Sequence, residues 1–139
     1  MKCGNAMLAV DTNVVIRFLT GDDVAQHKRA VALFERHTIW LARTVLLECE
    51  WVLRSAFGFT AAEIARAFHG LIHLPGVRCE DFPAVSEAVA ALAKGMDFAD
   101  ALHFISSREA GSEEGFASFD ACFVKRANAH WPDAGARVP

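Results

Sequence analysis

Four carboxylates in the sequence lie at positions where they can take part in chemistry at a common site. Two of them follow apolar stretches predicted to be strands, and two lie near the starts of predicted helices. The four residues are Asp11, Glu48, Asp100 and Asp120. Carboxylate oxygens in such numbers suit the hard cations Mg²⁺ and Mn²⁺, and a site of this kind supports hydrolysis at phosphorus.

Each carboxylate also has an ordinary structural interpretation. Asp11, Asp97 and Asp120 each precede a predicted helix and can serve as its N-cap. In the helix over 44–57, Glu50 and Arg54 are expected to form an exposed ion pair. Glu48 falls on an otherwise apolar flank of this helix and can be a structural glutamate with a partner. Asp100 can belong to a solvated polar stripe. For each residue taken alone, these alternatives remain open.

Short apolar strands alternating with helices position these residues. We predict strands over 7–11, 38–42, 77–79, 115–118 and 136–138, and helices over 12–19, 22–36, 44–57, 60–71, 81–94, 98–110 and 120–129. This alternation is typical of a parallel sheet covered by helices. We therefore expect an α/β protein with a three-layer α/β/α fold, a central parallel sheet of 4–5 short strands and about seven helices.

The predicted elements bring the four carboxylates toward one edge of the sheet. Asp11 and Asp120 follow the carboxyl ends of their strands, which is where parallel sheets bind ligands. Clustered carboxylates raise one another's pKa values, so such a group requires cations. Because the four cysteines and six histidines form no metal-binding pattern, we expect Mg²⁺ or Mn²⁺ rather than zinc.

The composition predicts one cytoplasmic domain without a membrane span. The chain has 139 residues, of which 53% are hydrophobic and 22% charged, enough for a core. No signal peptide is visible, and no apolar run approaches the ~18–20 residues of a membrane helix. The formal net charge of −3 argues against a generic basic nucleic-acid clamp, although an enzyme acting on nucleic acid is compatible with it.

Four stretches resemble, in order and spacing, the motifs of PIN-domain ribonucleases, specifically the VapC-type toxins of bacterial toxin–antitoxin pairs. They are AVDTNVVIRFLTGDD, TVLLECEWVLR, DFADALHF and FASFDACFVKRA, and they extend from Met7 to about Ala129. The resemblance implies a divalent-metal-dependent endoribonuclease that cleaves structured RNA of the tRNA or rRNA class. It also implies a homodimer that a small antitoxin protein holds inactive.

The resemblance assigns roles to individual residues. The four family carboxylates fall on Asp11, Glu48, Asp100 and Asp120. Asp97 matches an acidic position common in this branch of the family, while Asn13 and Ser118 match polar positions beside the cluster. Ser118 is expected to orient a carboxylate or a metal-bound water. Hydrolysis by such a site is expected to leave a 5′-phosphate and a 3′-hydroxyl.

Four basic residues lie near the expected active edge and are candidates for contacts with RNA phosphates, their alternative being ordinary solvated surface. They are Arg17, Arg43, Lys125 and Arg126. Because family members usually begin near Met7, we expect residues 1–6 to be an N-terminal extension and 7–139 to be a single PIN-like domain.

Other functions remain as alternatives. A phosphatase of the haloacid dehalogenase type needs a second aspartate two positions after the first, where Asn13 stands. A phosphoacceptor receiver domain needs an aspartate at the end of a central strand, and the stretch 38–44 has none. The remaining alternative is a catalytically inactive PIN-like module that binds a partner. Such a module is expected to have lost a carboxylate, and all four are present.

Overall fold

A computed structural model describes residues 6–139, and within them seven helices and five short strands alternate. In chain order they are β1 (Met7–Ala9), α1 (Thr12–Thr20), α2 (Val24–Arg36), β2 (Thr38–Leu41), α3 (Arg43–Ser55), α4 (Ala61–Ile72), β3 (Val77–Cys79), α5 (Phe82–Ala93), α6 (Phe98–Glu109), β4 (Phe116–Ala117), α7 (Ala121–His130) and β5 (Ala136–Arg137). Every predicted element is present, with ends within two residues of the prediction. Residues 1–5, most of the expected N-terminal extension, lie outside the described part.

The strands pair in parallel, as the alternation predicts. β2 is the middle strand of a sheet with the order β1-β2-β3, in which Leu8 pairs with Ile39 and Ile39 with Val77. β4 and β5 form a separate two-stranded parallel sheet. The α/β class with a central parallel sheet is confirmed, and the five strands are divided between two sheets rather than joined in one.

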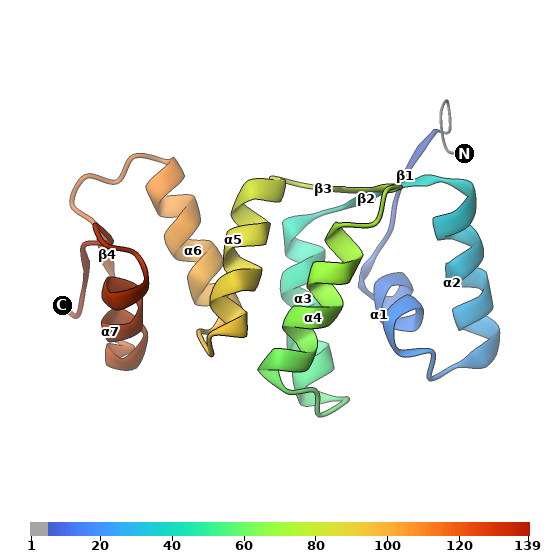
Figure 1. Cartoon of the computed structure of the whole chain (residues 1–139), viewed down its shortest axis with the longest axis horizontal. Helices are drawn as coiled ribbons and strands as arrows, with labels where there is room; N and C mark the ends of the chain where they lie inside the picture. The colour runs from blue at the N-terminus through green and yellow to red at the C-terminus, as the bar shows by residue number, and fades with distance from the viewer. Residues whose placement is uncertain (1–5) are drawn as a thin grey trace.

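Figure 1 shows how the helices are arranged along the longest axis of the molecule. α1 and α2 lie at one end, α3 and α4 in the middle, α5 and α6 beyond them, and α7 at the other end. Within residues 6–139, no helix is long and apolar enough to cross a membrane.

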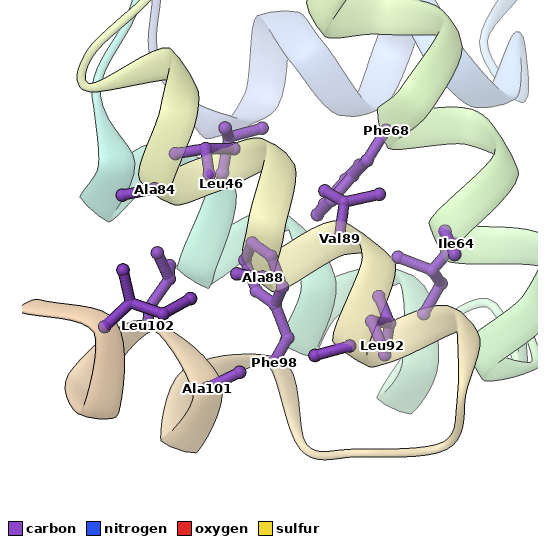
Figure 2. Packing of buried hydrophobic residues seen from close by; sticks show 14 of the residues in the cluster. Leu46, Ile64, Phe68, Ala84, Ala88, Val89, Leu92, Phe98, Ala101 and Leu102 are labelled. Atoms are coloured by element: carbon purple, nitrogen blue, oxygen red, sulfur yellow. The ribbon is translucent and has the colours of Figure 1, made fainter. Parts of the chain in front are cut away.

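The core is concentrated around helix α5, which packs against α4 and α6. Ala88 and Val89 of α5 lie in this cluster with Phe68 of α4 and Phe98 of α6 (Figure 2). The two phenylalanine rings meet edge to face, with centroids 5.5 Å apart. Alanine on the buried face of α5 lets the neighbouring helices approach closely, and this fixes the position of α6.

An aromatic cluster attaches the C-terminal segment, β4–α7–β5, to helix α6. Phe104 of α6 stacks on Trp131 at a centroid distance of 4.6 Å. Phe116 of β4 lies edge-on to Phe104 at 5.7 Å and to Phe123 of α7 at 5.9 Å. Aromatic pairs in these geometries contribute both buried area and favourable ring contacts. They hold the two-stranded sheet at α6, away from β1, and bring the start of α7 near α6.

Candidate active site

The first group of carboxylates lies where α1 packs against α3. Asp11 lies just beyond β1, with one residue between them, and the hydroxyl of the buried Thr12 donates a hydrogen bond to the carboxylate of Glu48. Both carboxylates are solvent-exposed. The Cys49 thiol lies beneath them and donates to the Thr12 carbonyl at 3.9 Å. Asp11 and Glu48, which are far apart in sequence, therefore lie together.

The two negative charges affect the pKa of the Cys49 thiol. Burial, followed by the negative charges of Glu48 and then Asp11, raises the pKa of Cys49 to about 12. At neutral pH the side chain is therefore a protonated thiol, which is neither a nucleophile nor a metal ligand. The chemistry available at this place belongs to the carboxylates.

The second group consists of Asp97, Asp100 and Asp120. The pKa of Asp100 is raised chiefly by desolvation, and the negative charges of Asp97 and Asp120 raise it further, whereas His103 acts in the opposite direction. Asp120 reaches this place because the aromatic cluster holds the start of α7 near α6. The third and fourth carboxylates predicted from the sequence are thus neighbours.

A cavity of about 610 Å³ between α3 and α6 connects the two groups. Its wall includes Glu48 from the first group and Asp97 from the second. Trp51, Arg54 and His103 also line it. Glu48 and Asp97 therefore face one groove. Asp11 lies beside Glu48, and Asp100 and Asp120 lie beside Asp97, but these three do not line the groove.

Three of the aspartates do act as N-caps, as the ordinary interpretation holds. The Oδ1 atoms of Asp11, Asp97 and Asp120 accept from the backbone N–H groups three residues ahead, at 3.1, 2.9 and 3.0 Å respectively. In the described chain the Oδ2 atoms of these residues have no hydrogen-bond partner. Capping uses one oxygen of each carboxylate and fixes the position of the side chain. The second oxygen therefore stays available for a chemical role.

The donor chemistry of this groove fits a hard cation, because all the candidate ligands are carboxylate oxygens. Nevertheless, no group of three or more His, Cys, Asp or Glu residues among 6–139 lies close enough together to hold a metal ion. Each group contributes one carboxylate to the cavity wall, and the two groups are not drawn together around a single point.

Helix α3 is rotated relative to the expectation from its sequence. The expected ion pair of Glu50 with Arg54 is present, with Arg54 Nε 2.8 Å from Glu50 Oε2. However, Glu50 is only 5% exposed, whereas Glu48 is exposed. The reason is that the buried stripe of α3 runs through Leu46, Cys49 and Leu53, which places Glu50 at its margin and turns Glu48 toward the groove.

The predicted supporting polar residues lie beside the carboxylates. Ser118 Oγ accepts from the backbone N–H of Asp120 at 3.0 Å, which fixes the start of α7. Asn13 is exposed at the start of α1 and lines a second groove, between α1 and α2.

The predicted RNA-contacting residues differ in how they are held. Arg17 pairs with Asp22 at 3.1 Å. Arg43 lies 3.6 Å from both Glu80 and Asp81, so its charge is largely committed within the protein. Arg126 donates to the Gly95 carbonyl, and Lys125 is exposed.

Two exposed aromatic side chains beside the carboxylates were not among the residues predicted from the sequence. Trp51 is 59% exposed on the wall of the groove, and Phe119 is 84% exposed immediately before Asp120. Their signal in the sequence is position: Trp51 lies one helical turn beyond Glu48, and Phe119 separates two site residues. Considered separately in the sequence, each of these two aromatic residues resembles an ordinary core residue.

Carboxylates that can hold divalent cations are typical of enzymes that act on phosphate esters. The family model of the PIN domain matches residues 8–128, and the chain belongs to this family. PIN domains are generally nucleases, and nucleases of the family commonly use divalent metals. No curated protein and no solved structure matches the chain.

Proposed function

We propose that this PIN-domain protein is a divalent-metal-dependent endoribonuclease whose active site is the groove between α3 and α6. The observation that carries the proposal is the set of carboxylates at this groove and beside it, contributed by four separate parts of a PIN-family chain. A fold kept only for binding a partner has no need to retain Asp11, Glu48, Asp100 and Asp120 together.

The metal requirement is supported by the donor set. Asp11 and Glu48 would hold Mg²⁺ or Mn²⁺ from one side of the groove, and Asp100 and Asp120 from the other. A bound divalent cation supplies water activation and stabilises the charge of a phosphoryl displacement. Asp97 acts as a positioning residue, because it caps the helix that carries Asp100.

The choice of RNA as substrate is supported by the resemblance to the motifs of VapC-type toxins. It is also supported by Trp51 and Phe119, since unpaired bases of RNA loops stack on exposed aromatic rings. We infer that the substrate is structured RNA of the tRNA or rRNA class.

We further propose that the protein is the toxin of a toxin–antitoxin pair, acts in the cytoplasm and forms a homodimer. The resemblance to VapC-type motifs carries these points. An antitoxin that presents an arginine to the groove would be held by charge-assisted hydrogen bonds to its carboxylates.

The test is cleavage of a pool of tRNA and rRNA by the purified protein, with Mn²⁺, with Mg²⁺ and with EDTA. We expect discrete fragments with 5′-phosphate and 3′-hydroxyl ends, which disappear with EDTA. Fragments ending in 2′,3′-cyclic phosphate would contradict hydrolysis by water. Absence of cleavage of any RNA by the folded, antitoxin-free protein would favour the inactive binding module.

A further inference from the structure

A second groove, between α1 and α2, has a distinctly cationic lining. Its volume is about 460 Å³. The polar residues on its walls are Asn13, Arg17, Gln26, Arg29, Arg36 and His37, and among the described residues that line it there is no aspartate or glutamate. The chain as a whole carries a formal net charge of −3, so the positive charge of a groove lined by three arginines is opposite in sign to that of the whole chain.

The charges of this groove are only partly compensated. At its mouth Arg17 forms an ion pair with Asp22 at 3.1 Å and donates to Gln26 at 2.7 Å. Arg29 is exposed on α2 and makes no ion pair within residues 6–139. A concave surface lined by one sign of charge concentrates its potential and attracts the opposite charge.

The groove begins beside the candidate active site. Asn13, at its inner end, is two residues from Asp11 and one from Thr12, which hydrogen-bonds to Glu48. From there the groove follows α1, a helix of nine residues and hence about 13 Å long. A polymer whose scissile bond lies at Asp11 therefore has the groove as a path for its flanking segment.

We propose that the α1–α2 groove binds phosphate groups of the RNA strand next to the cleavage site, an inference that rests on the proposed nuclease function. Arginine side chains bind phosphate through paired hydrogen bonds, which lysine does not reproduce. A strand with regularly spaced negative charges matches a row of arginines that starts at an acidic, metal-binding site.

The test is binding of a fluorescently labelled tRNA to the full chain in EDTA, followed by anisotropy over a range of salt concentrations. The Arg29→Ala/Arg36→Ala variant removes two groove cations. We expect this variant to bind at least roughly tenfold more weakly. The slope of log K against log salt concentration should fall in magnitude by about 1.5, since each lost phosphate contact lowers it by about 0.7–0.9. Arg29→Lys keeps both of the positive charges that the double variant removes. It is therefore expected to keep the wild-type slope and to lose less affinity than the double variant.

Lys28→Ala is the matched control. Lys28 is an exposed cation on the same helix and does not line the groove. Circular dichroism checks that every variant is folded. An equal loss in Lys28→Ala and Arg29→Ala/Arg36→Ala, or an unchanged salt slope in the latter, would overturn the proposal.

Two further outcomes identify which proposal fails. If the wild-type protein cleaves RNA and the groove variants bind RNA normally but lose binding of a poly-glutamate peptide, the groove serves an acidic protein segment and the inference is wrong. If the wild-type protein neither binds nor cleaves RNA, the proposed function fails, and the inference fails with it.

Discussion

At the scale of single residues, the candidate site shows that a structural and a chemical role can coexist in one carboxylate. Asp11, Asp97 and Asp120 each satisfy a backbone N–H of the helix they begin, and each leaves its second oxygen without a partner in the described chain. The cap therefore holds the carboxylate in place at the candidate site. Glu48 is held differently, by the hydroxyl of Thr12.

Asp100 is expected to reduce stability in the absence of metal. Its pKa is raised by desolvation first and then by Asp97 and Asp120, so the folded state binds its proton more tightly than the unfolded state does. Stability from this group is therefore full below the unfolded pKa, about 3.9, and is lost as the pH rises through the folded pKa. In EDTA at pH 7, Asp100→Asn should raise the melting temperature, as thermal unfolding would show.

The gain from Asp100→Asn should shrink as the pH falls and disappear well below the unfolded pKa of about 3.9, where the wild-type carboxyl is protonated in both states. Glu113→Gln, at an exposed position outside the groove, is the control and should change little. A melting temperature for Asp100→Asn that is lower than the wild-type value at pH 7 would contradict this account.

Trp51 is expected to contribute to RNA binding by stacking on an unpaired base. Because the side chain is 59% exposed, its loss should leave the fold intact. Stacking of one base is worth about 1–3 kcal/mol, so Trp51→Ala should weaken RNA binding roughly 5- to 150-fold, measured by anisotropy in EDTA. Trp51→Phe should retain most of the affinity. Equal binding by the wild type and Trp51→Ala would exclude the stacking role.

At the scale of elements, the sequence predicts the helices and strands well because their ends carry local signals. Aspartate caps, the Thr60–Glu63 capping box and the glycine after α1 mark boundaries that depend on neighbouring residues alone. The rotation of α3 was predicted wrongly, because Glu50 and Arg54 form their expected pair whether or not Glu50 is buried. Which flank of a helix is buried depends on its tertiary partners.

The contact between the turns that precede β4 and β5 gives a prediction at the same scale. Gly115 has φ +94°, and a Cβ at this position would lie 2.2 Å from the carbonyl oxygen of Gly135. Gly115→Ala should therefore lower the free energy of unfolding by about 2–4 kcal/mol, from backbone strain plus overpacking. Urea denaturation measures this loss.

Gly111→Ala is the matched control for Gly115→Ala. Gly111 also has a positive φ, +76°, but a Cβ there meets nothing within 4 Å. Only the conformational cost of about 1 kcal/mol is expected. Equal losses for the two variants would mean that the close approach to Gly135 does not matter for stability.

At the scale of the whole molecule, the arrangement of the strands was the part that the sequence did not specify. Asp11 comes after β1 and Asp120 after β4, and these two strands are in different sheets. The reason is that aromatic contacts to Phe104 hold β4 and β5 at α6. These contacts join residues far apart in the chain and leave no local pattern. The formal charge of −3 likewise gave no indication of the cationic α1–α2 groove.

If both groups of carboxylates belong to one nuclease site, neutral variants of either group should slow RNA cleavage in single-turnover experiments. The variants are Asp11→Asn, Glu48→Gln, Asp100→Asn and Asp120→Asn, with Asp133→Asn as the exposed control. Each of the four should lower the cleavage rate at least about 100-fold in Mn²⁺. Asp11→Asn/Asp120→Asn should be little worse than either single variant, because residues that act as a unit are not additive.

Cleavage at the wild-type rate after replacement of either Asp11 and Glu48 or Asp100 and Asp120 would exclude a shared site. That outcome would confine the chemistry to one group and leave the carboxylates of the other as helix caps and surface charges.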